Sequence, residues 1–328
     1  HGAEQWAKAM SHYGEAGGRA VERAAYAEGL SLLARALDAG ARLRGDAGSE
    51  IAVIDLKRTR ARAFLATGDV HSLLVELRDA EARAARFGVP RLSCQLRTQR
   101  AHVESIFGGH SRRAVGYGRE AAKIAARVGD AELASAARFV LGQAFWVAGD
   151  YVAAVAELGH DLAAYRDGRH LGRTASGATL AVEGLAIFGS ALGALGRFDE
   201  AREIAAEAQA LATRTGHPLD LAFADWHLAA TLLAQARPEE ASLLLERGLD
   251  LALRFGLPLS ALASEALLGR SACLLGRAGE ALERLDRVLD GCAQRRLRHL
   301  AVQALLAKVE ASLVLDRPEA AGLAAEAL

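Results

Sequence analysis

The sequence predicts an all-α fold, a right-handed α-α superhelix (solenoid) of helical hairpins that repeat about every 40 residues. Three observations lead to this prediction: a recurring turn signature, a second series of helix ends between its copies, and a composition suited to closely packed helices. Hydrophobic residues make up 52% of the chain and aromatic residues only 5%, so alanine and leucine must fill most of the core.

The first observation is a six-residue turn signature that starts with glycine, continues with arginine or aspartate and ends in alanine. Its copies begin at Gly68, Gly108, Gly149, Gly196, Ala236, Gly276 and Asp316, the first two being weak and two lacking the glycine. Successive starts lie 40, 41, 47, 40, 40 and 40 residues apart. Such regularity is typical of a repeat protein.

The second observation is a glycine that lies two residues after an arginine, midway between the turn copies. These glycines are Gly88, Gly129, Gly168, Gly216 and Gly256. A glycine at this place allows the positive φ that ends a helix, and a proline two residues after three of them prevents the helix from continuing. All five prolines fall in predicted turns. Each repeat therefore contains two helices of roughly 15 to 18 residues.

The interval of 47 residues contains an insertion near Asp167 to Thr179, where glycines weaken helix propensity. We expect a longer loop or a lengthened helix there, forming a surface feature of functional interest. Because each repeat packs only on its neighbours, residues 1–328 are predicted to form a single repeat domain. The chain starts at His1 and stops within a helical pattern, so we expect it to be a fragment of a longer protein.

Composition and charge restrict the classes of partner. The 40 basic and 40 acidic residues give a net charge of zero, which argues against a nucleic-acid or membrane partner. The excess of arginine over lysine is explained by a GC-rich genome better than by a binding surface. The densest basic stretch has acidic residues interleaved and is interpreted as a solvated face; it contains Arg284, Arg287, Arg295, Arg296, Arg298 and His299.

The cysteines and the hydropathy pattern predict a cytoplasmic protein. Cys94, Cys273 and Cys292 are odd in number and far apart, as in a reduced intracellular protein. Cys273 and Cys292 fall on the two helices of one repeat, and apolar filling is favoured over pairing. No uncharged apolar run of about 18 residues and no leader pattern is found.

Catalytic and cofactor motifs are not found in the sequence. No glycine precedes a lysine as in a phosphate-binding loop, and neither H-E-x-x-H nor G-x-S-x-G occurs. A partial dinucleotide fingerprint at Gly116 is better explained by helix packing. The histidines show no metal-ligand spacing: neither His217 with His227 nor His160 with Asp161 and His170 is a convincing ligand set. We therefore predict no catalytic residues, no metal and no cofactor.

The repeats resemble the tetratricopeptide repeat, in which a Leu-Gly pair on the first helix faces a small residue on the second. The corresponding sets are Leu141-Gly142 with Ala154, Phe188-Gly189 with Ala201, Leu268-Gly269 with Ala281, and the variant Leu228-Ala229 with Ala241. Small residues at these places let the two helices cross closely.

Residues 15–37 resemble the start of the helical repeat region in bacterial signalling proteins that join a class III adenylate or guanylate cyclase to an AAA-type ATPase. Similar regions follow the ATPase in maltose-activator-like transcription factors. The resemblance implies a sensing or interaction arm rather than an enzyme.

In such a superhelix the first helices line the concave face. Counting back from the turns places these residues there: Phe139, Gln143, Trp146, Glu183, Ser190, Phe223, Trp226 and Arg270. Aromatic anchors with a few polar groups between them suit an extended peptide, a partner helix or a small-molecule effector. The alternative is that the aromatic residues only pack against adjacent repeats.

The sequence thus predicts a protein-interaction or effector-sensing module of an intracellular bacterial signalling protein, binding a peptide, partner protein or ligand on its concave face. The alternative is the small-inducer-binding regulatory region of a transcriptional activator. An enzyme is disfavoured because no nucleophile, base and orienting group converge at readable spacing.

Overall fold

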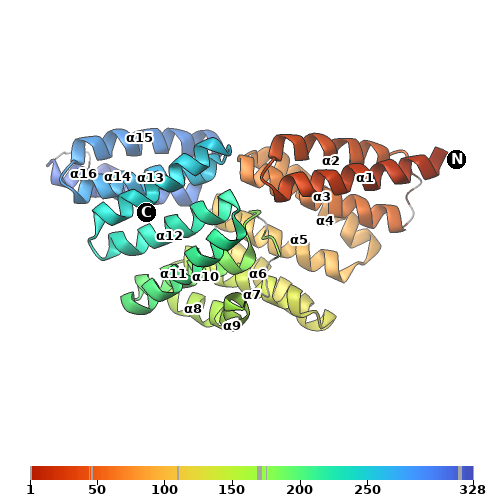
Figure 1. The fold of residues 1–328 in the computed structure, drawn as a ribbon, viewed down its shortest axis with the longest axis horizontal. Helices are drawn as coiled ribbons and strands as arrows, with labels where there is room; N and C mark the ends of the chain where they lie inside the picture. Colours follow the sequence, from red (N-terminus) through yellow and green to blue (C-terminus); the bar gives the residue numbers. More distant parts are fainter. Residues whose placement is uncertain are drawn as a thin grey trace.

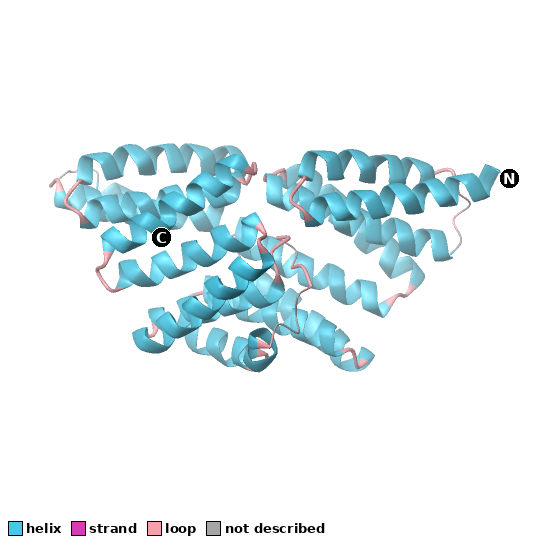
Figure 2. Ribbon diagram, in the orientation of Figure 1, coloured by secondary structure: helices cyan, strands magenta, loops and turns pink. Residues whose placement is uncertain are grey.

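The computed structural model describes residues 2–43, 45, 47–108, 111–167, 172–174, 176–316 and 320–327. These residues are helical apart from short connections, and one isolated antiparallel bridge joins Arg173 and Thr179 (Figure 2). The helices pair into consecutive antiparallel hairpins that stack in a superhelix, so the all-α prediction is confirmed.

Each hairpin has a first helix that faces the interior and a second that packs outside it (Figure 1). The first helices are α1 (Gly2–Glu22), α3 (Ala47–Thr67), α5 (Pro90–Val103), α7 (Ala131–Val147), α10 (Leu180–Ala194), α12 (Pro218–Ala234), α14 (Pro258–Leu274) and α16 (Arg298–Val314). The second helices are α2 (Tyr26–Gly40), α4 (Val70–Phe87), α6 (Ser111–Val128), α8 (Tyr151–Gly159) with α9 (Leu162–Arg166), α11 (Phe198–Thr215), α13 (Pro238–Arg254), α15 (Ala278–Arg295) and α17 (Ala320–Ala327).

The predicted turns coincide with residues of positive φ. Within hairpins these are Gly68, Gly149, Gly196, Gly276, Ala236 and Asp316, and between hairpins Gly88, Gly129, Gly216 and Gly256. The weak copy at Gly108 differs, because a π-helical segment, η1 (Glu104–Gly108), extends α5 up to this residue, and the two residues that follow lie outside the described part of the chain. The predicted turn at Gly168 and part of the turn after Asp316 lie outside the described residues.

Ala236 and Gly196 allow the turn conformation to be tested in both directions. Ala236 has φ 54° and Gly196 has φ 75° at equivalent places. A Cβ in this left-handed region costs about 1 kcal/mol, part of which is offset by the greater chain entropy of an unfolded glycine. We expect Ala236→Gly to stabilise the protein by about 0.5 kcal/mol and Gly196→Ala to destabilise it by about 1 kcal/mol in urea unfolding. Equal effects of the two changes would contradict this account.

Small residues bring the two helices of a hairpin together, as the resemblance to tetratricopeptide repeats implies. A Cβ added at Gly142 would lie 2.6 Å from Leu158 Cγ, and one added at Gly269 would lie 2.8 Å from Leu285 Cγ. Neither distance leaves room for a methyl group without a shift of the partner helix. The glycine of the Leu-Gly pair is therefore a packing requirement at these two hairpins.

The superhelix curls until its C-terminal hairpins meet its N-terminal ones. Helix α14 contacts α3, and α16 contacts η1, across more than 190 residues of sequence (Figure 1). One hydrophobic cluster joins Leu65 and Phe107 from the N-terminal part with Val288, Cys292 and Leu297 from the C-terminal part. The concave face is therefore a largely enclosed interior rather than an open groove.

The insertion is a loop, and its described residues lie partly at the surface, at Asp167 and Gly172, and partly in the interior. Thr174, Ala178 and Thr179 are buried, and Ala178 belongs to a cluster with Tyr26 of α2 and Leu219 of α12. The loop thus projects into the interior and connects the N-terminal hairpin with the middle of the array. The expectation of a surface element holds at Asp167 and Gly172 but not at Thr174, Ala178 and Thr179, which the enclosed interior surrounds with apolar neighbours.

Candidate binding groove

The first helices enclose two adjoining cavities inside the superhelix. The larger, of about 750 Å³, lies against α1, α3, α5, α7 and the loop at 172–174. The smaller, of about 160 Å³, lies against the C-terminal ends of α3 and α7, against η1, and against α10, α12, α14 and α16. One turn along α7 leads from Phe139 in the first cavity to Gln143 in the second. We call the two the polar cavity and the apolar cavity, and together the interior groove.

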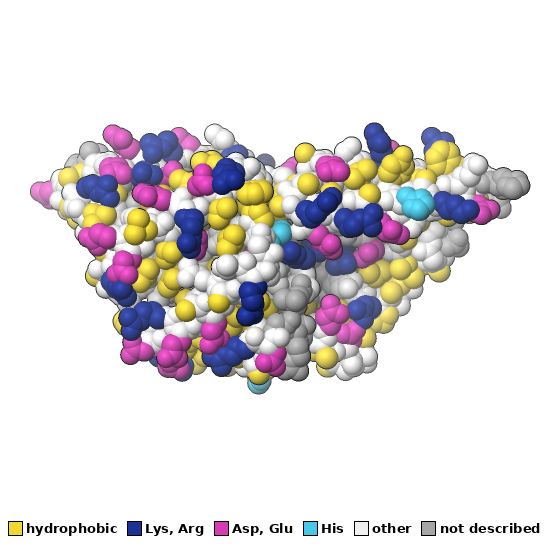
Figure 3. Space-filling model, in the orientation of Figure 1, with side chains coloured by type: hydrophobic (Ala, Val, Ile, Leu, Met, Phe, Trp, Pro, Cys, Tyr) yellow, Lys and Arg dark blue, Asp and Glu magenta, His cyan; other side chains and the backbone are white. Residues whose placement is uncertain are grey.

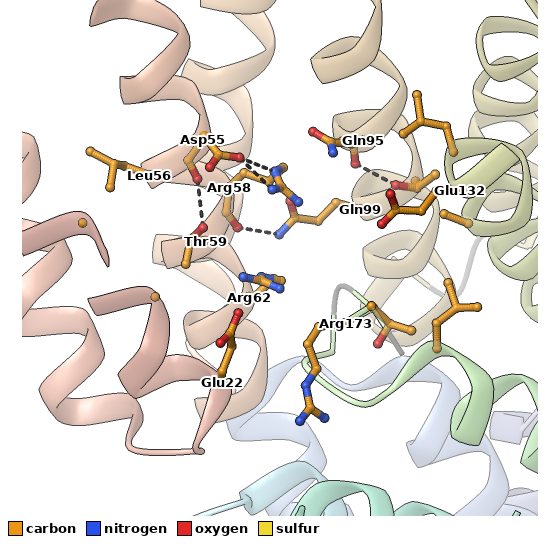
Figure 4. A pocket seen from close by; sticks show the side chains of 18 of the residues that line it. Glu22, Asp55, Leu56, Arg58, Thr59, Arg62, Gln95, Gln99, Glu132 and Arg173 are labelled. Carbon is orange, nitrogen blue, oxygen red and sulfur yellow. Dashed lines mark hydrogen bonds and ion pairs between the residues drawn. The ribbon is translucent and has the colours of Figure 1, made fainter. Parts of the chain in front are cut away.

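Charged side chains of both signs line the polar cavity (Figure 4). They are Arg19, Arg58, Arg62, Arg173, Glu15, Glu22, Asp55 and Glu132. Arg58 Nη2 lies 2.7 Å from Asp55 Oδ1, and Arg173 Nη1 lies 3.3 Å from Asp220 Oδ2. Arg19 and Glu132 also have partners, at 3.8 Å and 3.6 Å. Arg62 forms neither an ion pair nor a hydrogen bond with any side chain that the structure describes.

Aromatic rings form one wall of the apolar cavity. The ring centroids of Trp146 and Trp226 are 6.1 Å apart in an edge-to-face arrangement, although the residues lie on α7 and α12, two hairpins apart. The His227 ring lies 5.4 Å from Trp146 and 4.8 Å from Phe223, and the His299 ring lies 5.9 Å from Trp146. Edge-to-face rings at such distances attract one another beyond their apolar burial. The cluster presents a rigid aromatic surface to the cavity.

A chain of buried polar groups crosses the floor of the apolar cavity. His102 Nδ1 lies 2.6 Å from Gln143 Oε1, Gln143 Nε2 lies 3.5 Å from Glu183 Oε1, and Ser176 Oγ donates to Glu183 Oε2 at 3.1 Å. Burial raises the pKa of Glu183 to about 7, against the lowering effect of the hydrogen bonds. Burial also lowers the pKa of His102 to about 4, so this imidazole is neutral at neutral pH.

Asp220 on α12 fixes the inserted loop against the rest of the array. Its carboxylate accepts hydrogen bonds from the Thr179 backbone N–H at 2.7 Å, from Thr179 Oγ1 at 2.6 Å and from Thr215 Oγ1 at 2.8 Å. Arg173 approaches the same carboxylate from the loop. A buried carboxylate with several donors and a cation is a stable arrangement. The loop therefore holds Thr174 and Ser176 at the boundary between the two cavities.

The structure brings most of the predicted groove residues together. Those that line the apolar cavity are Gln143, Trp146, Glu183, Phe223 and Trp226. Phe139 is buried and lines the polar cavity. Arg270 and Ser190 line neither cavity, and Arg270 instead pairs with Glu310 of the next hairpin at 3.2 Å.

The aromatic residues also pack between repeats, as the alternative interpretation expects. Trp226 Nε1 donates to the Ala263 carbonyl of α14 at 3.0 Å. The two interpretations coexist at this residue, because one edge of the indole makes the contact with α14 while the side chain lines the apolar cavity. Packing of this kind holds the ring in one orientation.

The polar cavity was not predicted from the sequence. Arg62 and Gln99 belong to the two hairpins with weak turn copies, where the helix phase was hardest to assign. From the sequence, His227 was considered only as a metal ligand and His299 only as part of the basic stretch, whereas both line the apolar cavity. Periodicity of the first helices, once extended to α1, α3 and α5, would have placed Arg62 on the interior face.

Two other expectations concern charge and membranes. On the face in Figure 3, acidic and basic side chains are interspersed, and Arg284 of the basic stretch donates to Glu265 at 2.8 Å and to Glu280 at 3.0 Å.

Among the described residues, no helix is long and apolar enough to cross a membrane. No cluster of three histidine, cysteine or acidic side chains in that part of the chain has a geometry that could hold a metal ion.

Comparison with known proteins supports the fold. No protein-family model and no curated protein sequence matches this chain. A Rap protein complexed with competence and sporulation factor superposes with a TM-score of 0.70 and 13% identity, covering 99% of this chain and 89% of that one. The fold is a tetratricopeptide-like solenoid.

Two further solved structures superpose over nearly the whole chain. The Rap conjugation gene regulator of plasmid pLS20, in complex with the Phr* peptide, has a TM-score of 0.56 and 13% identity, covering 97% of this chain and 86% of that one. Aspartyl phosphate phosphatase F from Bacillus subtilis has a TM-score of 0.54 and 11% identity, covering 97% and 82%. At these identities the likeness establishes the architecture alone.

Proposed function

We propose that this chain is a binding module that takes a short peptide, or an extended segment of a partner protein, into the interior groove of its superhelix. The observation that carries the proposal is the pairing of two cavities of opposite character along the same helices. The polar cavity offers an uncompensated cation, and the apolar cavity offers the Trp146 and Trp226 rings. A peptide has both kinds of group on one chain, at spacings of a few ångström.

The size and the enclosure of the groove support the same ligand class. Ligand sites are typically cavities of about 300–1,000 Å³ with a few converging polar groups, and the polar cavity falls in this range. Two of the superposing Rap proteins are complexes with a peptide or a signalling factor. The fold they share with this chain supports a peptide ligand without assigning a particular peptide or its position.

Binding stabilises the closed form of the superhelix, in which its two ends are in contact. A ligand in the groove contacts hairpins from both ends, so it favours the curvature in which α3 and α14, and η1 and α16, remain in contact. In a larger intracellular bacterial signalling protein, an attached domain would respond to that curvature. The chain itself carries no catalytic role in this proposal.

The experiment that tests the proposal uses a synthetic library of N-terminally labelled hexapeptides and fluorescence anisotropy with the 328-residue chain. We expect saturable binding, and we expect the Trp146→Ala, Trp226→Ala double variant to lose about 2 kcal/mol or more of binding free energy, roughly 30-fold in affinity. Helical content, measured by circular dichroism, should stay unchanged.

Trp6→Ala is the matched control for the tryptophan variants. Trp6 is 39% exposed on α1, lies over Arg42 and lines neither cavity. Its removal should leave the affinity unchanged. Unaltered affinity in the double variant would place peptide binding outside the groove and contradict the proposal.

A small inducer is the second candidate ligand, and the apolar cavity favours it. At about 160 Å³, with aromatic walls and the buried Glu183, this cavity suits a compact apolar molecule with a hydrogen-bonding group. The chain would then be the regulatory region of a transcriptional activator. A DNA-binding segment encoded in the same open reading frame would favour this candidate, whereas a cyclase and a phosphate-loop ATPase would favour the signalling module.

A further inference from the structure

Arg62 is an uncompensated cation inside the groove. Its side chain extends from α3 into the polar cavity (Figure 4), and its Nε atom is buried without an acceptor within the described part of the chain. Burial lowers the pKa of Arg62 to about 10 and the Arg58 guanidinium lowers it further, while Asp55 and Glu22 raise it; the group is still charged at neutral pH. A partly buried guanidinium of this kind is stabilised by an anion with matching acceptors.

The other charges of the polar cavity do not supply that anion. Asp55 is engaged by Arg58, and Glu15 lies beside Arg19. Glu22 lies on the same side of the cavity as Arg62 (Figure 4), but no ion pair joins the two among the described side chains. Arg173 points away from Arg62, toward Asp220. Asp55 and Glu22 thus act on Arg62 only at a distance, and no described carboxylate forms an ion pair with it, so the guanidinium is free to bind the anionic group of a ligand.

Gln99 places an unpartnered acceptor in the lining of the same cavity. The Gln99 side chain is 3% exposed, and its Nε2 donates to the Arg58 carbonyl at 3.2 Å, one helical turn before Arg62. This bond orients the amide, and Gln99 Oε1 is left buried without a donor in the described structure. Buried acceptors in native proteins almost always have a partner, so this one awaits an N–H group.

We propose that the polar cavity binds the C-terminal residue of the peptide, with the terminal carboxylate on Arg62 and the backbone N–H of the same residue on Gln99 Oε1. This inference rests on the proposed function and specifies which end of the peptide enters the polar cavity. The preceding residues then extend along α7 from Phe139 toward Gln143, which brings an apolar side chain against Trp146 and Trp226.

The pair of vacant groups favours a C-terminus over other anions. A C-terminal residue carries a carboxylate and an N–H on one Cα, so it satisfies the guanidinium and the amide oxygen together. An acidic side chain places its carboxylate on a flexible stem away from the backbone N–H. Inorganic sulfate has acceptors only, so it would leave Gln99 Oε1 without a donor.

The test compares two labelled hexapeptide libraries of the same composition, one with free C-terminal carboxylates and one with C-terminal amides. We expect the free acids to bind about ten-fold more tightly, because a charge-assisted bidentate pair is lost in the amides. In Arg62→Gln this preference should fall to about one, and the thermal midpoint of the free protein should rise because an unpaired buried charge is removed.

A second variant and a control separate this effect from misfolding. Gln99→Glu places a carboxylate beside Arg62, so it should also abolish the free-acid preference, by internal competition, while adding an ion pair to the folded state. Arg19→Gln removes an exposed arginine that lines the same cavity and is paired with Glu15. The ten-fold preference should remain in that control.

The outcomes distinguish this inference from the proposed function. Equal affinity of the wild-type protein for acids and amides would overturn the assignment of the C-terminus while peptide binding stands. Displacement of the peptides by sodium sulfate, beyond the effect of sodium chloride at equal ionic strength, would indicate a general anion site and also overturn it. If no member of either library binds, the proposed function fails, and this inference fails with it.

Discussion

Phe107→Ala should destabilise the protein by about 3–4 kcal/mol and open both ends of the superhelix. Phe107 lies on η1, is 6% exposed and belongs to the cluster that joins Leu65 with Val288 and Leu297. The contact between η1 and α16 is one of the few that connect hairpins far apart in sequence. An array whose repeats contact only their neighbours unfolds from its ends. The contact between η1 and α16 couples the C-terminal hairpins to the N-terminal part, which such an array lacks.

The measurement is native-state hydrogen exchange resolved by helix, alongside urea unfolding. Amides of α16 should exchange about 100-fold faster in Phe107→Ala, as expected when a contact worth about 3 kcal/mol is lost from a local opening reaction. Phe188→Ala is the matched control, because Phe188 is 8% exposed on α10 and belongs to a cluster that contains no residue of α14 or α16. It should reduce the global stability by a similar amount without selectively exposing α16. Equal exchange of α16 in the two variants would show that closure does not couple the ends.

The repeat architecture could be predicted from sequence because its determinants are local. Gly149 and Gly196 have a positive φ at the turns, and the close approach of α7 and α8 depends on small residues such as Gly142. The period then follows by counting. Near Gly108 the local pattern is less informative, because a π-helical segment extends α5 up to that residue.

The closure of the superhelix could not be predicted from the period. It depends on the small rotation from each hairpin to the next, accumulated over the whole array, and no single residue determines that rotation. For the same reason, the sequence placed Trp146 and Trp226 on one face but did not indicate that their rings lie 6.1 Å apart. The burial of the inserted loop is a further consequence of closure.

The polar cavity remained hidden for a different reason. Arg62 is one of many arginines, and the high arginine content was explained by genome composition. What distinguishes Arg62 is the lack of a partner, which depends on the positions of Asp55, Glu22 and Gln99 in space. A pattern of residue types in the sequence carries no information about an interaction that is missing.

Glu183→Gln should stabilise the protein by about 3 kcal/mol at pH 8 and have little effect at pH 5. Glu183 is fully buried, and burial raises its pKa from 4.5 to about 7. Between pH 4.5 and about 7 the folded state therefore keeps the Glu183 proton, whereas the unfolded state has released it. The free energy of unfolding consequently falls as the pH rises through this range. The difference between the two pKa values corresponds to about 3 kcal/mol above pH 7, where the ionised carboxylate must be kept in the interior.

His102 and His227 change the stability with pH in the opposite direction to Glu183. The effect of Glu183 can therefore be measured only by comparing wild type with Glu183→Gln. Burial lowers the pKa of His102 to about 4 and that of His227 to about 3, so each removes stability as the pH falls below 6.5. Wild-type stability alone mixes these contributions, whereas the difference between wild type and Glu183→Gln isolates the carboxyl group. Urea unfolding at pH 5, 6, 7 and 8 should show this difference growing between pH 5 and 7 and then levelling off.

Asp220→Asn is the contrasting control for Glu183, because the two buried carboxylates differ in their hydrogen-bond donors. Asp220 accepts bonds from Thr179 and Thr215 and faces Arg173, so its negative charge is compensated. Its neutralisation should cost about 2–3 kcal/mol at pH 8, the opposite sign to Glu183→Gln. Two results would contradict the prediction: an effect of Glu183→Gln that does not change with pH, or a loss of stability at pH 8. Either would mean that the ionised Glu183 carboxylate is stabilised in the groove by more than its hydrogen bonds to Ser176 and Gln143.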